Sequence, residues 1–123
     1  MATCILRDFT EIGDYMKPYV VAEVNTSHSG NMDTAFEMIL KAKETGCNCV
    51  KFQSWSSESL YSKSYYDANP IAKRIVSKFS LSEAQLWEVA LFCKEQKIAF
   101  ASTPYSRQEV DFLLEKCYNY CEG

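Results

Sequence analysis

A lysine and a glutamine interrupt an apolar segment in the stretch CNCVKFQSW, residues 47–55. If this segment is a β-strand, alternation places Val50 and Phe52 on one face and Lys51 and Gln53 on the other. A buried ammonium group must be paired or it loses its proton, so Lys51 needs an anionic partner. A bound phosphate or carboxylate would fill that role, and so would an internal ion pair.

Polar side chains also stand at the ends of two other apolar segments, YVVAEV and IAFAS. Glu23 lies near the end of the first segment, and Ser102 and Thr103 close the second. In parallel α/β folds, ligands gather at the carboxyl ends of the strands. We therefore expect these three residues to meet Lys51 and Gln53 at one site that binds an anionic ligand.

Several of these residues fit more than one role. Glu23 could act as a general base, hold a metal-bound water, or pair with Lys51. Thr103, which precedes Pro104, could contact a phosphate or only form the turn into a helix. His28 is the only histidine in the sequence, and we interpret it as a loop-stabilising residue rather than a ligand or a base.

Three repeats of a strand, a polar loop and an amphipathic helix position these residues. The predicted strands are 19–24, 47–53 and 98–102. A helix at about 31–45 follows the first strand, and capping boxes at 82–85 and 106–109 indicate the starts of two more helices. Strands that alternate with helices predict a parallel sheet with right-handed crossovers, so the predicted fold class is α/β.

Each of these helices needs an apolar stripe that packs against the sheet. In the helix at 31–45 the stripe is predicted to comprise Met32, Ala35, Phe36, Ile39 and Leu40. In the helix after 106–109 it is predicted to comprise Val110, Leu113, Leu114 and Cys117. Gly46 is placed to end the first helix in the left-handed conformation.

One connection is far longer than the few residues that usually follow a strand. Residues 54–80 are rich in serine and tyrosine, and a short helix is predicted there with Asn69 as its cap and Pro70 at its first position. The apolar line of that helix would be Ile71, Ile75 and Phe79. A long βα loop of this kind is typical of a lid, a binding loop or a contact surface.

Composition narrows the class of protein. The chain has 123 residues and a net charge of −3, and it contains nothing near the ~20 consecutive apolar residues of a membrane span. We therefore expect one domain in the cytoplasm that binds neither nucleic acid nor a membrane. Its six cysteines are interpreted as reduced thiols; a zinc site that uses Cys117 and Cys121 with Cys47 and Cys49 is the alternative.

Three stretches resemble one known family in their order along the chain. AEVNTSHSGNMDTA, VKFQSW and FASTPYS are similar to the first three strand-end motifs of the sialic acid synthase family, which includes the N-acetylneuraminate, legionaminic and pseudaminic acid synthases. The resemblance extends from about Tyr19 to Glu115. The first loop departs from the family pattern, because Asn25 and Ser27 stand where many members have glycine and asparagine.

The resemblance implies an enzyme of carbohydrate biosynthesis. Members of the family condense phosphoenolpyruvate with an open-chain N-acetyl-hexosamine, release phosphate and form a nonulosonic acid of the sialic type. They use a divalent metal, Mn or Mg, and a (β/α)8 TIM barrel, commonly followed by an antifreeze-like domain, and the full-length form is expected to be a homodimer. The metal ligands of the family are expected to be absent from this chain.

The resemblance also assigns roles to individual residues. It implies that Lys51 holds phosphoenolpyruvate and that Glu23 lies beside the metal and the reacting carbons, so these two are the expected catalytic residues. The expected substrate-binding residues are Gln53 for the amino-sugar, Thr103 for the phosphate, and Ser102 and Asn69.

The extent of the resemblance predicts an incomplete barrel. After Glu115 the sequence reads KCYNYCEG, which does not resemble the fourth strand of the family. Residues 1–123 are therefore expected to be the N-terminal fragment of a TIM-barrel domain. The fragment would cover roughly the first three βα units, would lack the C-terminal antifreeze-like domain and would be inactive alone. The alternative is a stand-alone α/β module that binds a phosphorylated ligand or a partner chain.

Overall fold

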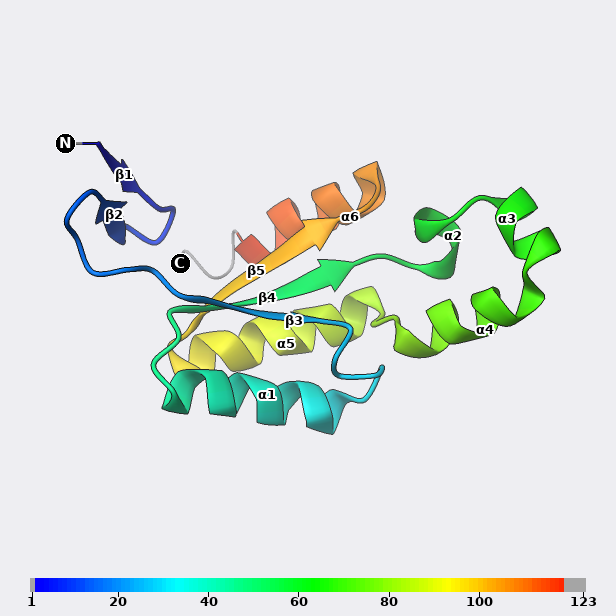
Figure 1. Ribbon diagram of the computed structural model, residues 1–123, viewed down its shortest axis with the longest axis horizontal. Helices are drawn as coiled ribbons and strands as arrows, with labels where there is room; N and C mark the ends of the chain where they lie inside the picture. Colours follow the sequence, from blue (N-terminus) through cyan, green and yellow to red (C-terminus); the bar gives the residue numbers. More distant parts are fainter. Residues whose placement is uncertain (1, 119–123) are drawn as a thin grey trace.

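The computed structural model describes residues 2–118 of the chain. A small antiparallel hairpin comes first, and a parallel sheet of three strands follows (Figure 1). The strands are β1 (Thr3–Ile5), β2 (Glu11–Gly13), β3 (Val21–Asn25), β4 (Cys49–Ser54) and β5 (Ala99–Pro104). The helices are α1 (Met32–Glu44), α2 (Ser57–Leu60), α3 (Lys63–Ala68), α4 (Pro70–Phe79), α5 (Glu83–Gln96) and α6 (Arg107–Phe112), which continues as a π-helical segment, Leu113–Tyr118. The α/β class and the parallel strands are confirmed, and the hairpin is a feature that the sequence analysis missed.

The sheet brings the predicted strand ends together. Its strands lie in the order β3-β4-β5, and Lys51 is level with Glu23 on one side and with Ala101 on the other. Gln53 is level with Thr103. Because residues paired across neighbouring strands point to the same face, these five side chains share one face. In Figure 1 the hairpin lies at the amino ends of the strands, and α2 to α4 lie beyond their carboxyl ends.

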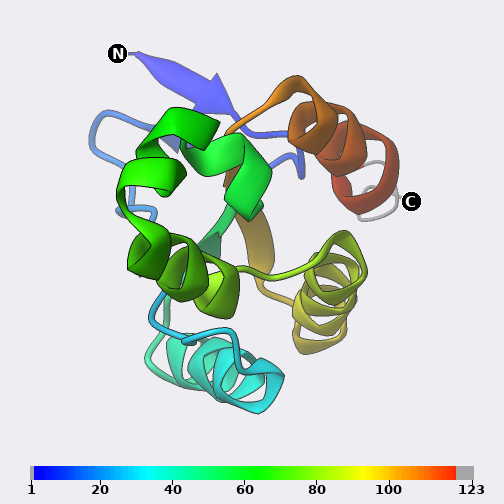
Figure 2. The ribbon, with the colours of Figure 1, turned by 90° about the vertical axis from the view of Figure 1, so that its right-hand side faces the viewer.

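The other face of the sheet carries the hydrophobic core. Val50 and Phe52 have no exposed surface, as alternation along the strand predicts. Helices α1, α5 and α6 stand side by side around this face (Figure 2). The other buried members of the main cluster come from β3, α1, α5 and the segments that flank α5: Val24, Ala35, Ile39, Ala42, Leu81, Leu86, Val89, Cys93 and Ile98.

Helix α1 packs through a stripe slightly different from the predicted one. Ala35 and Ile39 are fully buried, but Leu40 is 44% exposed and Ala42 takes its place in the core. The contact line therefore follows positions i, i+4 and i+7, and a residue at i+5 points away from it. The prediction for Leu40 is wrong. An apolar residue that lies next to the buried stripe fits the same spacing pattern, although its side chain faces solvent.

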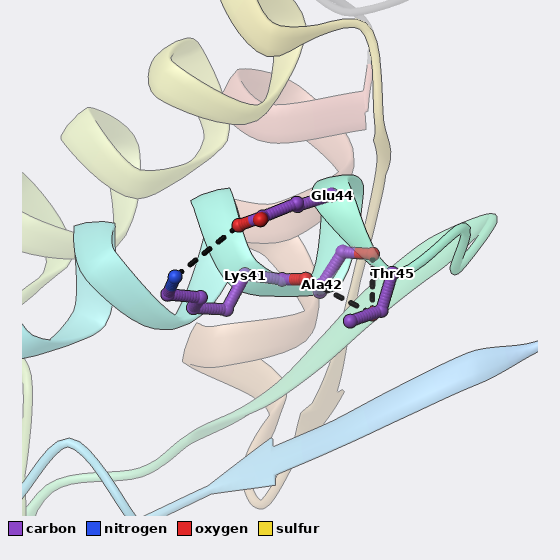
Figure 3. A network of polar contacts seen from close by, with 4 residues as sticks. All are labelled: Lys41, Ala42, Glu44 and Thr45. Atoms are coloured by element: carbon purple, nitrogen blue, oxygen red, sulfur yellow. Dashed lines mark hydrogen bonds and ion pairs between the residues drawn. The ribbon is translucent and has the colours of Figure 1, made fainter.

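The ends of α1 are held by local hydrogen bonds. Asn31 accepts from the Thr34 backbone N–H at 3.0 Å and so caps the start. At the other end the Thr45 hydroxyl donates to the carbonyls of Lys41 and Ala42, at 2.9 and 3.1 Å (Figure 3). An exposed ion pair of 3.2 Å joins Lys41 to Glu44 on the same turn. Gly46 then follows with φ of +90°, as predicted.

The two predicted capping boxes have different outcomes. The box at the start of α5 is complete, because Ser82 and Gln85 each bond the backbone N–H of the other. At α6, Ser106 accepts from the Glu109 N–H, but the Glu109 carboxylate instead accepts from the Ser59 hydroxyl at 2.6 Å. Glu109 is buried, so it ties α6 to the helix that follows β4.

The stripe of α6 is only half as predicted. Leu113 and Cys117 are buried against Ala90 of α5. Val110 and Leu114 are partly exposed instead. Leu113 and Cys117 are one turn apart and make a single contact line with α5, and the other two side chains lie off that line.

Residues 54–80 fold into three short helices with a core of their own. Trp55, Tyr66 and Val76 are buried in that cluster, and Leu60 and Phe79 pack against it. Pro70 begins α4 as predicted, but the Asn69 side chain makes no capping bond. Ile71 and Ile75 were predicted to face inward and are exposed, since Val76 is the residue of α4 that turns toward Trp55.

The long connection touches the first loop at one glycine. Gly30 has φ of +75°, and any side chain at this position would collide with the carbonyl of Lys78 at the end of α4. Gly30 is therefore required both for the left-handed turn and for the close approach of two backbone segments.

The helices and the cysteines bear on the predicted class of protein. Among residues 2–118, no helix is both long enough and apolar enough to cross a membrane. Within the same part of the chain, no disulfide is formed by Cys4, Cys47, Cys49, Cys93 or Cys117. Cys121, which the zinc alternative requires, lies outside the described residues.

Candidate functional site

Lys51 and Glu23 form the centre of the candidate site. The Lys51 Nζ lies 3.0 Å from the Glu23 Oε1, and the two side chains are 38% and 49% exposed. The internal ion pair that the sequence allowed is therefore formed. Both charges still reach solvent, so an incoming anion can approach Lys51 without displacing any packed side chain.

Gln53 and Thr103 extend this face toward the carboxyl ends of the strands. They lie level with each other on β4 and β5, and both are half-buried. The Gln53 amide oxygen accepts a hydrogen bond of 3.1 Å from the indole N–H of Trp55. Together with Lys51, which lies two residues before Gln53 on the same face, this arrangement offers one cation and two polar side chains. Such a group suits an oxygen-rich anion.

Two predicted substrate-binding residues are not brought to this group. The Ser102 hydroxyl lies 2.6 Å from that of Ser54 in a buried pair, on the face that carries Phe52. Asn69 lies at the junction of α3 and α4, at the outer end of the long connection (Figure 1), and its amide donates to the Tyr65 carbonyl at 3.0 Å. Both residues support structure in this arrangement.

A hollow lies on the amino side of Lys51. It has a volume of about 680 Å3 and is lined by strand residues, by the tip of the hairpin and by α5 beyond the edge of β5. Its charged residues are Arg7, Asp8, Lys51, Lys94 and Lys97. Cations dominate, but of the predicted site residues only Lys51 lines this space. In a closed barrel the interior is filled by side chains of further strands, so we place ligand binding at the strand ends rather than here.

Two neutral groups stand below Lys51 in this hollow. Burial raises the pKa of the Cys49 thiol. Burial, together with the neighbouring Cys49, raises the pKa of Tyr19 to about 12. Both groups therefore keep their protons at neutral pH and do not compete with a ligand anion for Lys51.

His28 stabilises the loop after β3, as the sequence suggested. It is buried, its Nδ1 accepts from the Gly30 N–H at 2.9 Å, and its ring stacks on Phe52 with centroids 5.9 Å apart. Desolvation by burial lowers its pKa. A neutral, enclosed imidazole on the core face of the sheet has no access to the candidate site.

Sequence reasoning did not connect Trp55 with Gln53, and it missed the hairpin residues. The position of Trp55 could have indicated this contact, because a residue two positions after Gln53 lies on the same face of an extended chain. Arg7 and Asp8 carried no such signal, because nothing local shows that the N-terminal hairpin folds back toward the sheet.

Comparison with known proteins identifies the family. The sequence model described as the NeuB family matches residues 38–120. The chain belongs to the NeuB family. This match includes β4 and β5, and so it covers Lys51, Gln53 and Thr103 of the candidate site.

Curated relatives of this NeuB chain include synthases of N-acetylneuraminate-9-phosphate and of N,N'-diacetyllegionaminic acid. The N,N'-diacetyllegionaminic acid synthase of Campylobacter jejuni is 32% identical over 108 residues, which are 80% of this chain and 32% of that protein. The N-acetylneuraminate-9-phosphate synthase of Drosophila melanogaster is 29% identical over 103 residues, which are 77% of this chain and 28% of that protein. The chain thus spans about a third of the length of the curated relatives it matches.

Solved structures also match this chain over only about a third of their own length. The N-acetylneuraminic acid synthetase of Leptospira borgpetersenii superposes with a TM-score of 0.80 at 23% identity, over 93% of this chain and 38% of that one. The spore coat polysaccharide biosynthesis protein SpsE of Bacillus subtilis superposes with a TM-score of 0.69 at 25% identity, over 92% and 30%. The fold of this NeuB chain is therefore part of a TIM barrel, and β3, β4 and β5 with their helices are three of its βα units.

Proposed function

We propose that this chain supplies the first three βα units of a synthase that condenses phosphoenolpyruvate with an N-acetyl-hexosamine. The product is a nonulosonic acid of the sialic type. Overall, a carbon–carbon bond forms between the two substrates, one water is consumed and inorganic phosphate leaves. The observation that carries this proposal is the group of Lys51, Glu23, Gln53 and Thr103 on one face of the sheet, within a chain of the NeuB family.

In this proposal each residue has a distinct task. The Lys51 ammonium binds the negatively charged phosphoenolpyruvate through charge-assisted hydrogen bonds. Glu23 holds Lys51 in place before the substrate arrives and is the nearest carboxylate for a proton transfer. Thr103 donates its hydroxyl to the phosphate, and Gln53 contacts the sugar. None of these tasks requires Ser102 or Asn69.

The divalent metal expected of the family does not find a ligand set in this part of the protein. Among residues 2–118 no group of three or more His, Cys, Asp or Glu side chains is arranged to hold a metal ion. Glu23 is the single carboxylate of the candidate site and already pairs with Lys51.

A graft tests the proposal directly. The chain replaces the matching third of the Campylobacter jejuni N,N'-diacetyllegionaminic acid synthase, and phosphate release from phosphoenolpyruvate is measured with that enzyme's own sugar. We expect activity in the graft, its loss in a Lys51→Met graft and no turnover by residues 1–123 alone, because three βα units do not enclose a site. A folded graft without activity would refute the proposed function.

The hollow of about 680 Å3 favours a second candidate, a stand-alone module that binds a phosphorylated ligand. Its cationic lining is present without any further strand. Size-exclusion chromatography and a thermal melt of residues 1–123 separate the two proposals. A monomer with one sharp transition favours the module, whereas aggregation or a broad transition favours a part of a barrel.

A further inference from the structure

The hydrogen bond between Trp55 and Gln53 determines which end of the Gln53 amide is free. The indole N–H is only a donor, so its partner at 3.1 Å must be the amide oxygen. The Gln53 NH2 group consequently points away from Trp55. The contact joins residues i and i+2 of an extended segment, so it forms without any distortion of the strand.

The orientation of Trp55 depends on the long connection. Its side chain is 6% exposed and belongs to the small core that Tyr66 and Val76 complete, with Leu60 and Phe79 against it. Close packing of this kind restricts the rotation of a buried indole ring. The packing of α2 to α4 therefore holds the indole N–H in its direction.

The free end of Gln53 is available to a ligand. No acceptor is recorded for its NH2 group within residues 2–118, and the side chain is half-buried beside Thr103 and two residues after Lys51. An NH2 group can only donate, so the ligand atom that it meets must be an acceptor. A carbonyl, hydroxyl or carboxylate oxygen fits this position, and an N–H group does not.

We propose that Trp55 is a positioning residue, which fixes the Gln53 amide so that Gln53 recognises an acceptor oxygen of the substrate. The identity of that substrate as an N-acetyl-hexosamine rests on the proposed function. The hydrogen bond and the direction of the amide do not depend on the proposed function. Substrate recognition by β4 is in this way coupled to the folding of residues 54–80.

The first experiment needs no ligand. NMR spectra of 15N-labelled protein show one indole N–H signal for each of Trp55 and Trp87, and Trp87→Phe assigns them. Gln53→Leu should shift the Trp55 signal upfield and speed its exchange with solvent, because the acceptor is gone. Gln53→Glu keeps an acceptor oxygen and should retain the protected signal. An unchanged Trp55 signal in Gln53→Leu would overturn the positioning role.

The second experiment follows sugar binding by the grafted synthase, with that enzyme's own sugar and in the presence of phosphoenolpyruvate. Trp55→Phe keeps the ring in its cluster but frees the amide, and affinity should fall about fivefold. Gln53→Glu keeps the bond to Trp55 but loses the donors, and affinity should fall at least about tenfold. Wild-type affinity in either variant would overturn the acceptor assignment.

The outcomes separate this inference from the proposed function. A lost indole hydrogen bond in Gln53→Leu, combined with no sugar binding by the graft without further substitutions, would count against the proposed function and still support the positioning role. Normal sugar binding by both variants would support the proposed function and overturn the inference.

Discussion

The two faces of the sheet differ in what they require from the rest of the protein. On the face toward α1 and α5, Val50 and Phe52 are completely enclosed by side chains of the same chain. On the other face, Lys51 and Glu23 satisfy each other and remain partly exposed. Neighbouring positions of β4 thus serve stability and binding separately, and substitutions on the two faces should affect different measurements.

The largest effect is expected for Phe52→Ala. Phe52 has no exposed surface, and its removal leaves a cavity between the sheet, α1 and α5. We expect the free energy of unfolding to fall by about 3–5 kcal/mol, measured by urea denaturation. A loss below about 1 kcal/mol would show that the core face is not closed as described.

Lys51→Met is the matched change on the other face. The Lys51–Glu23 pair is partly exposed, so the free energy of unfolding should change by less than about 1 kcal/mol. In the grafted synthase, phosphate release should fall by at least about 100-fold, because the substrate anion loses its cation. Strong destabilisation with normal turnover would show that Lys51 serves stability rather than binding.

The Ser54–Ser102 pair tests whether Ser102 belongs to the core face. Ser54→Ala removes this buried hydrogen bond and should cost about 0.5–1.5 kcal/mol in urea denaturation. The double variant Ser54→Ala/Ser102→Ala should cost less than the sum of the two single changes. Additive losses would mean that the two hydroxyls act independently.

The smallest effect is expected from the titration of His28. Its pKa is lowered in the folded protein by burial, so the unfolded chain takes up a proton first as the pH falls. The contribution of His28 to stability is therefore complete above about pH 6.5, the ordinary value, and declines as the pH falls below it toward the folded-state pKa. Urea denaturation at several pH values measures this decline. His28→Gln should remove that part of the pH dependence, and an unchanged profile would show that another group causes it.

The sequence predicted the alternation on β4 correctly because a strand has only two faces. Lys51 and Gln53 had to share one face once Val50 and Phe52 were assigned to the core. The same rule, applied to β5, places Ser102 with Phe52 and Thr103 with Gln53. Ser102 was grouped with the site residues because it lies at the end of an apolar strand, and alternation along that strand was not applied to it.

Helical positions were harder to predict than strand positions. Leu40, Ile75 and Val110 all follow an apolar spacing, yet each lies partly exposed beside its buried line. A helix has 3.6 residues per turn, so more than one set of apolar residues in a sequence can form the buried stripe. The packing partner decides which set is buried. The partner of α4 is Trp55, which the sequence alone does not place near Val76.

The contact of Gly30 with the carbonyl of Lys78 limits how the long connection can move. With no side chain between them, the loop after β3 and the end of α4 rest directly against each other. A hinged flap over the strand tips would have to drag the first loop along or break this contact. Movement of α4 is therefore coupled to movement of the first loop, and Gly30→Ala would force these two backbone segments apart.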